Sequence, residues 1–152
     1  MPRRFFALFA ALGLVLASAP ARAHDWNAKQ IQWQTYAAGL KLARRTHKPI
    51  MLVVFTEWCP HCRNYSAVFK DQRIVQLARK FVMIHVDKDQ QPDVSHLYAP
   101  DGEYIPRTYF LSSKAVLDQD IHAPRESFRY FYDERDPTSV LAGMHEAARR
   151  LK

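Results

Sequence analysis

Hydrophobic residues in this chain gather into short, nearly unbroken runs, and the segments between the runs show helical spacing. Residues 50–55 and 81–86 are apolar at almost every position, which is typical of central strands that are covered on both faces. Residues 31–33 predict a further short strand. Residues 108–111 predict another, which a turn joins to an antiparallel partner at 115–117.

Helical spacing predicts the elements between these strands. A helix over residues 36–47 is expected to begin at Thr35, whose side chain can cap it. A second helix is expected to start near Cys59, and residues 74–78 continue it after a break near Asp71. Because these helices join strands that run in the same direction, we expect a right-handed crossover.

The remaining segments are less regular. Residues 87–104 are polar and contain Pro and Gly, which predicts an irregular loop, and the aromatic side chains of residues 119–135 are expected to pack onto the core. Asp136 and Pro137 then predict the start of a C-terminal helix. The order βαβαββα indicates an α/β fold, with a single domain in which helices flank a central mixed β-sheet.

The N-terminus carries the features of a secretory signal peptide. Arg3–Arg4 is a basic start, residues 5–17 are apolar, and Ala21-Arg22-Ala23 fits the rule for a cleavage site. We therefore expect residues 1–23 to be a signal peptide that is cut before His24, and an uncleaved anchor stays open as the alternative.

Removal of this leader changes the charge of the protein. It takes away three arginines and no acidic residue, so the formal net charge falls from +7 to +4. Residues 24–152 then form the expected folded domain, which carries mixed charges without a concentrated basic run. We expect no nucleic-acid partner for this domain, and we expect it to be a monomer.

The only two cysteines of the chain lie in the stretch Trp58-Cys59-Pro60-His61-Cys62, at a predicted junction between a strand and a helix. A cysteine at a helix N-terminus faces unpaired backbone N–H groups and the positive end of the helix dipole, and both favour the thiolate over the thiol. The thiolate is the nucleophile, and Cys62 lies one turn further on, within reach for a disulfide. The motif therefore predicts a redox-active dithiol.

Two other uses of the pair stay open. A structural disulfide in so small a ring restrains the unfolded chain by only about 2 kcal/mol, against about 3 kcal/mol for a 15-residue loop. A metal site needs further ligands, and neither a second C-x-x-C nor an H-x(3–5)-H pair follows. Arg63 stands where a c-type haem motif requires histidine. We therefore predict no metal and no cofactor.

With C-x-x-C after its second strand, this order of elements resembles the thioredoxin superfamily. A closer resemblance covers nearly all of the mature chain. Residues 31–33, 81–83, 100–107 and 130–132 are similar to the small endoplasmic-reticulum proteins of the anterior gradient group, which includes thioredoxin domain-containing protein 12. The Cys-Pro-His-Cys centre instead matches the bacterial disulfide oxidase DsbA, and the leader is of bacterial type.

The resemblance implies a division of roles in the motif. Cys59 is expected to be the exposed, attacking thiol, and Cys62 the partly covered, resolving thiol. His61 can donate a hydrogen bond or positive charge to the Cys59 thiolate, which makes the disulfide more oxidising; the alternative is an imidazole that is simply exposed to solvent. Pro60 fixes φ in the first helical turn.

Ile105–Pro106 forms the second part of the implied site. In the superfamily, a cis-proline before the third core strand faces the C-x-x-C motif, and the residue before it offers backbone hydrogen bonds to a substrate peptide. The resemblance therefore implies a cis bond at Pro106 and substrate contact at Ile105. Trp58 is expected to give the substrate an apolar surface beside the thiol, with core packing as the alternative.

Val53 departs from the pattern of the superfamily. Thioredoxin and DsbA carry a buried acid six residues before the first cysteine, where it relays a proton to the resolving thiol, and anterior gradient proteins are apolar there. Proton transfer at the second cysteine then depends on water or on another group. The sequence offers four candidates without ranking them: Glu57, His85, His96 and Glu103.

These observations predict a periplasmic thiol–disulfide oxidoreductase that acts through Cys59 and Cys62. Oxidation is favoured over reduction on the basis of His61 alone, and isomerisation is disfavoured because no separate dimerisation segment is present. The expected partners are thiols and disulfides of exported proteins, together with a redox partner, which the sequence does not identify, that resets the pair. The alternative is a non-catalytic module of the same fold that holds client proteins or delivers copper.

Overall fold

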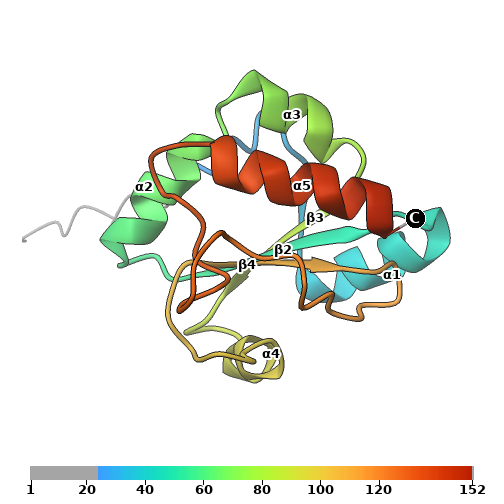
Figure 1. The fold of residues 1–152 in the computed structure, drawn as a ribbon. Helices are drawn as coiled ribbons and strands as arrows, with labels where there is room; N and C mark the ends of the chain where they lie inside the picture. Colours follow the sequence, from blue (N-terminus) through green and yellow to red (C-terminus); the bar gives the residue numbers. More distant parts are fainter. Residues whose placement is uncertain (1–23, 152) are drawn as a thin grey trace, which may run out of the picture.

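A computed structural model describes residues 24–151, so the predicted signal peptide and its cleavage site lie outside the described residues. Within this range, no helix is both long and apolar enough to cross a membrane. The described chain folds into one central sheet with helices on either side of it (Figure 1). This arrangement confirms the predicted α/β fold class.

The sheet contains β1 (Trp33–Gln34), β2 (Ile50–Phe55), β3 (Val82–Asp87) and β4 (Arg107–Leu111), in the spatial order β1-β3-β2-β4. Strand β3 runs parallel to both of its neighbours, β1 and β2. Strand β4 pairs with β2 in the antiparallel direction. The sheet is therefore mixed, as predicted, with the two most apolar strands at its centre.

Helices cover both faces of this sheet (Figure 1). On one face lie α1 (Tyr36–Thr46) and α4 (Pro92–Leu97). On the other face lie α2 (Pro60–Val68), α3 (Gln72–Ala78) and α5 (Thr138–Arg150). A sheet that is covered in this way has a separate core on each side.

Local side-chain chemistry explains where two of the helices start. The Thr35 side chain accepts a hydrogen bond from the Ala38 N–H at 3.4 Å and caps α1, which ends at His47 in the left-handed region (φ 56°). The Asp71 carboxylate accepts a hydrogen bond from the Arg73 N–H at 2.8 Å and caps α3. Both caps lie where the sequence predicted a start or a break.

The unbroken apolar run of β2 reflects burial on both faces. All six of its residues are buried, and alternate side chains enter the two cores. One set faces α2, α3 and α5, and the other faces α1: Met51, Val53 and Phe55 belong to the first set, and Ile50, Leu52 and Val54 belong to the second. Helix α1 packs closely against β3, and a Cβ atom at Gly39 would overlap the Ile84 side chain.

Two predictions for irregular segments are wrong. Residues 115–117 do not form a strand; they make a single antiparallel bridge to β4. Ala115 has left-handed backbone angles (φ 64°), which interrupt an extended chain. Residues 87–104 are not wholly irregular, since α4 forms within them and begins at Pro92, a residue suited to a first helical turn.

The aromatic segment 119–135 packs onto the core in part. Tyr130 and Tyr132 are buried, one in each core, whereas Phe128 is 53% exposed. The Thr108 N–H donates to the carbonyl oxygen of Tyr130 at 2.8 Å, so this segment runs beside β4. The segment 119–135, for which no helix or strand was predicted, therefore lies along β4 at the edge of the sheet.

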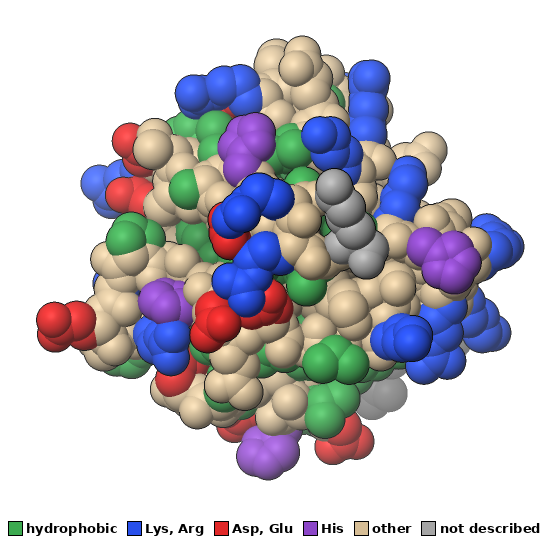
Figure 2. All heavy atoms as spheres, turned by 45° about the vertical axis from the view of Figure 1, so that its right-hand side comes forward, with side chains coloured by type: hydrophobic (Ala, Val, Ile, Leu, Met, Phe, Trp, Pro, Cys, Tyr) green, Lys and Arg blue, Asp and Glu red, His purple; other side chains and the backbone are tan. Residues whose placement is uncertain are grey.

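The surface mixes charges of both signs. Figure 2 shows basic and acidic side chains side by side on the left of the face that it displays, whereas its right side carries mainly lysine and arginine side chains. At the end of α5, Arg150 Nη2 lies 3.0 Å from a carboxylate oxygen of Asp118 and 3.2 Å from one of Asp120. These pairs tie the C-terminal helix to the loop that follows β4.

Candidate active site

The two cysteines lie at the start of α2, shortly after the end of β2. Cys59 is the N-cap residue, with extended backbone angles (φ −76°, ψ 118°), and Pro60 occupies the first helical position. The Cys62 N–H donates to Cys59 Sγ at 3.3 Å, so the sulfur accepts a hydrogen bond from one of the otherwise unpaired N–H groups at the helix N-terminus. This is the position that the sequence predicted for the reactive sulfur.

The burial of the pair differs from the expectation for Cys59. Cys59 is 3% exposed, Cys62 is fully buried, and both are free thiols. We expected the first sulfur to be exposed, but it folds back over the helix N-terminus to accept the N–H of Cys62. Burial and, to a smaller extent, the hydrogen bond with Cys59 raise the pKa of the Cys62 thiol far above its ordinary value. Cys62 therefore keeps its proton at neutral pH until another group removes it.

His61 is engaged by a carboxylate rather than by the Cys59 sulfur. Its Nδ1 lies 2.6 Å from Glu134 Oε2, and the other oxygen of Glu134 accepts a hydrogen bond from Asn64 Nδ2 at 2.9 Å. The His61 side chain is 60% exposed, whereas that of Glu134 is only 14% exposed. The structure therefore differs from the predicted interaction of His61 with the Cys59 thiolate, because Glu134 holds the imidazole.

Glu134 is the site residue that the sequence did not reveal. It lies 73 positions after His61, within the segment 119–135 for which no element was predicted. A pairing over this separation leaves no periodic or local trace in a single sequence. No signal in the chain could therefore have identified it.

Trp58 lies on the surface next to the first cysteine. Its indole ring is 68% exposed, and Nε1–H donates to Asp89 Oδ2 at 2.7 Å. Asp89 follows β3, so this hydrogen bond links the loops at the ends of the two central strands. The exposed ring favours the predicted surface role over core packing.

The Ile105–Pro106 peptide bond is cis and directly precedes β4. Arg107 pairs with Val54 in the sheet, so Pro106 lies at the same end of the sheet as the last residues of β2. The loop that carries Cys59 leaves from that end. Pro106 is buried, and Ile105 is half-buried against both cores. The structure thus brings both predicted parts of the site to one end of the sheet.

Arg107 fixes the proline loop from inside the protein. Its side chain is fully buried and donates to the carbonyl oxygens of Tyr98 and Gly102, each at 3.0 Å. It also donates to the Ser95 hydroxyl, which belongs to α4. The unpredicted helix α4 therefore helps to place Pro106, through a residue that the sequence did not single out.

The residues around Val53 show which of the candidate groups lies best for proton transfer to or from Cys62. Val53 pairs in register with His85 on β3, so both side chains lie on the face of the sheet that holds the cysteines. Burial lowers the pKa of His85, and the charge of Glu57 opposes this shift. His96 instead lies on α4, largely exposed, with Nδ1 3.7 Å from Glu103. His85 is therefore better placed than His96 or Glu103.

Glu57, two residues before Cys59, is held by the first described residue. The His24 N–H donates to Glu57 Oε2 at 3.1 Å, and His24 Nε2 lies 2.9 Å from the carbonyl oxygen of Thr56. His24 is buried and its ring lies edge-on to that of Trp26, with 6.3 Å between the ring centres. The N-terminal segment thus fixes the backbone that leads into the cysteine motif.

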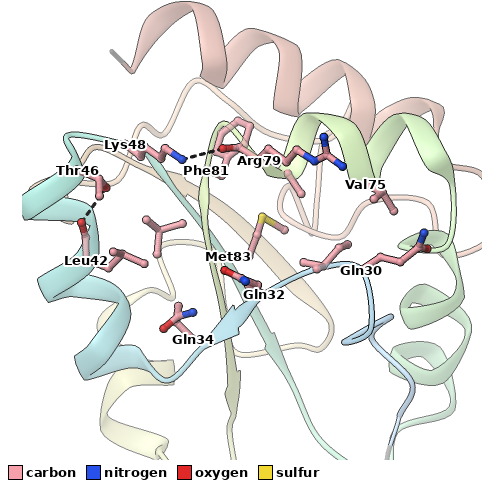
Figure 3. A pocket seen from close by; sticks show the side chains of 13 residues that line it. Gln30, Gln32, Gln34, Leu42, Thr46, Lys48, Val75, Arg79, Phe81 and Met83 are labelled. Atoms are coloured by element: carbon pink, nitrogen blue, oxygen red, sulfur yellow. Dashed lines mark hydrogen bonds between the residues drawn. The ribbon is translucent and has the colours of Figure 1, made fainter.

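A hollow of about 460 Å³ lies at the opposite end of the sheet, between α1, α3 and β1 (Figure 3). At its rim, Lys48 Nζ donates to the carbonyl oxygen of Arg79 at 2.9 Å, while Gln30, Gln32 and Gln34 line the other side. The hollow shares no residue with the cysteine site. Within residues 24–151, no group of three or more His, Cys, Asp or Glu side chains is arranged to hold a metal ion.

A mixed sheet, a C-x-x-C pair at a helix N-terminus and a cis-proline loop at the same end define a thioredoxin-type domain. A thioredoxin-like family model matches residues 32–113. The anterior gradient protein 2 homolog of Homo sapiens is 30% identical over 128 residues, which cover 84% of this chain and 71% of that protein. The chain therefore belongs to the thioredoxin-like family, and the resemblance to anterior gradient proteins is confirmed.

Two solved structures show the same fold. A thioredoxin from Thermus thermophilus has a TM-score of 0.58 at 20% identity, with 77% of this chain and 86% of that one covered. The DsbH oxidoreductase has a TM-score of 0.58 at 17% identity, with 92% of this chain and 96% of that one covered. Together, the family and the cysteine pair identify a thioredoxin-fold protein of the disulfide oxidoreductase type.

Proposed function

We propose that this protein is a bacterial periplasmic thiol–disulfide oxidoreductase that acts on the cysteines of exported proteins. The observation that carries the proposal is the Cys59 sulfur at the N-terminus of α2, where it accepts the Cys62 N–H. A backbone N–H group and the positive end of a helix stabilise negative charge on sulfur, and the thiolate is the form that attacks disulfides. The signal peptide predicted at residues 1–23 supports export.

Two exchange steps accomplish the reaction. When the protein reduces a client, the Cys59 thiolate attacks a client disulfide, forms a mixed disulfide, and releases one client thiolate, which takes up a proton. Cys62 then loses its proton and attacks the Cys59 sulfur, which releases the second client thiolate and leaves a Cys59–Cys62 disulfide. Two electrons have passed to the client, and a dithiol of a redox partner restores the pair. Oxidation of a client is the reverse sequence, after which a partner disulfide restores the pair.

The client is proposed to bind at the end of the sheet that carries Trp58, Cys59 and Pro106. The exposed indole of Trp58 offers apolar surface to the client. Ile105, which precedes the cis-proline, would offer backbone hydrogen bonds to the client, as the corresponding residue does in the thioredoxin superfamily. Because so little of the Cys59 side chain is exposed, a client must displace part of its cover before the sulfurs meet. Substrate binding and access to the thiol are therefore linked.

Oxidation of clients is the direction that we favour, with an intermediate reduction potential. Positive charge on His61 stabilises a nearby Cys59 thiolate, and therefore the reduced protein, but the carboxylate of Glu134 lies 2.6 Å from the imidazole. We expect a potential between those of thioredoxin, about −270 mV, and DsbA, about −120 mV. Equilibration of the purified protein with glutathione buffers measures this potential.

Trapping of clients tests the proposed activity in cells. In Cys62→Ala, the attacking cysteine can form mixed disulfides that the missing second thiol cannot resolve. We expect this variant to carry exported proteins that dithiothreitol releases, and the double variant Cys59→Ala/Cys62→Ala to carry none. If the single variant captures nothing and the wild type fails to equilibrate with glutathione, the proposal is refuted.

A client-binding module without redox activity is the second candidate. The burial of Cys59 and the exposed ring of Trp58 are the observations that favour it. In that case Cys59→Ser would keep full activity in cells and Trp58→Ala would lose it, whereas an oxidoreductase cannot tolerate the loss of its attacking sulfur. Stoichiometric binding of Cu(I) with loss of thiol reactivity would instead indicate copper delivery.

A further inference from the structure

We infer that Glu134 is a positioning residue that restrains the oxidising power of the cysteine pair by holding His61. The inference rests on the proposed thiol–disulfide exchange and concerns the redox equilibrium of the same site. Its starting point is the distance of 2.6 Å between His61 Nδ1 and Glu134 Oε2. At this distance, Nδ1–H donates to the carboxylate, which fixes the orientation of the ring.

The carboxylate of Glu134 is held at two points by one helix. His61 and Asn64 are three residues apart on α2, so their side chains lie on the same side of it and reach the two oxygens of one carboxylate. Glu134 is partly buried, with 14% of its side chain exposed, whereas 60% of the His61 side chain is exposed. The carboxylate is therefore the anchor, and the imidazole is the group that it restrains.

The segment that supplies Glu134 is fastened beside the helix by aromatic and cationic contacts. The Phe131 ring lies edge-on to the His61 ring, with 5.9 Å between the ring centres. The Arg125 guanidinium lies 5.0 Å from the centre of the Phe131 ring and donates to the Phe131 carbonyl oxygen at 2.9 Å. Arg135 Nε lies 3.8 Å from the other carboxylate oxygen of Glu134. These contacts keep Glu134 at the start of α2.

The carboxylate opposes the effect that His61 has on the sulfur. Reduction of the Cys59–Cys62 disulfide produces a sulfur that carries negative charge, and an imidazolium stabilises that charge. The negative charge of a carboxylate bound to the imidazole opposes the effect of the positive imidazolium charge on the sulfur. Glu134 therefore favours the disulfide form relative to a chain with a neutral amide at this position.

The substitution Glu134→Gln tests this inference through the equilibrium with glutathione. In that reaction, the protein disulfide takes two electrons from two glutathione thiols, which yields the dithiol protein and one glutathione disulfide. We expect the equilibrium to shift toward the dithiol protein by about twofold to fivefold, the range of an exposed ion pair. Glu126→Gln removes the same charge from an exposed position of the same segment and should leave the equilibrium unchanged.

A double-mutant cycle shows whether the effect passes through the imidazole. In a His61→Ala background, Glu134→Gln should no longer shift the equilibrium, and Asn64→Ala should produce a smaller shift of the same sign as Glu134→Gln. An equal shift with and without the imidazole would overturn the inference, because Glu134 would then act on the sulfur directly. A shift toward the disulfide protein would overturn it as well.

Failure of the inference can be distinguished from failure of the proposed function. The thiolate fraction of Cys59, read from its ultraviolet absorbance, needs no client and no redox partner. We expect Glu134→Gln to increase this fraction when both proteins are compared at the same pH. If the wild type does not exchange with glutathione, the proposed function fails; if the thiolate fraction does not change, the inference fails.

Discussion

The hydrogen bond between Tyr65 and Thr108 should make a measurable contribution to the free energy of unfolding. The two hydroxyl oxygens are 2.8 Å apart, and both side chains are almost completely buried. The bond joins α2, which carries the second cysteine, to β4, which follows the proline loop. Burial raises the pKa of the Tyr65 hydroxyl, so the phenol stays protonated and the bond persists over the physiological range.

The expected loss in the free energy of unfolding depends on which hydroxyl group each substitution leaves buried without a hydrogen-bond partner. Tyr65→Phe leaves the Thr108 hydroxyl buried without its partner, and Thr108→Val does the same to the Tyr65 hydroxyl. Each change should lower the free energy of unfolding by about 1–3 kcal/mol. The double variant replaces both partners with apolar groups of similar shape. Its loss should therefore be smaller than the sum of the two single losses by at least about 1 kcal/mol.

Urea unfolding at neutral pH measures these differences. With an m-value of about 2 kcal/mol/M, a loss of 2 kcal/mol moves the midpoint by about 1 M, while the slope should stay the same. Tyr36→Phe is a matched control, because its hydroxyl lies 2.9 Å from that of Tyr98 at a half-buried position, and water can replace the bond. Strict additivity in the double variant would refute the reasoning, since it would mean that the two hydroxyls do not stabilise each other.

Three further outcomes are expected. Asp71→Ala should lower the melting temperature at neutral pH and reduce the loss of stability on acidification. A hydrogen bond from Arg73 lowers the pKa of the Asp71 carboxyl to about 2, so the stability that this carboxylate contributes is present above the ordinary carboxyl range and is lost as the pH falls toward about 2. Thermal melts at decreasing pH measure this loss. His85→Phe should flatten the pH dependence of the free energy of unfolding between about pH 7 and about pH 5. Burial lowers the pKa of His85, so in this range the unfolded chain binds a proton that the folded chain does not. Urea midpoints at the two pH values measure the difference. Trp58→Ala should change the free energy of unfolding by less than about 0.5 kcal/mol, because the ring is exposed, yet slow the exchange with a peptide disulfide in stopped-flow measurements.

The parts of the fold that depend on neighbouring residues could be predicted from the sequence. The apolar run of residues 50–55 predicted a central strand because burial on both faces needs no polar alternation. Thr35 and Asp71 marked helix starts because a cap bonds to a backbone group only two or three residues away. The position of Cys59 at a helix N-terminus followed from the same local logic.

Contacts between distant segments could not be predicted from a single sequence. Glu134 reaches His61 across 73 positions, and Asp89 reaches Trp58 across 31, so neither pair leaves a local pattern. The burial of Cys59 also depends on how the rest of the chain packs around the helix N-terminus. The strand predicted at 115–117 does not form, because Ala115 adopts left-handed backbone angles that the hydrophobic pattern gives no sign of.

If the cleavage that the sequence predicts before His24 takes place, the contact between His24 and Glu57 would link that cut to the turn before Cys59. If a peptidase cuts the chain before His24, the amide nitrogen that now lies 3.1 Å from the Glu57 carboxylate becomes an α-ammonium group, and the hydrogen bond becomes an ion pair. An uncut chain would lack this positive charge at His24, so the turn that leads to Cys59 would gain the ion pair only after the cut. Protein that starts at His24 is therefore expected to melt at a higher temperature than protein with one extra residue at that end.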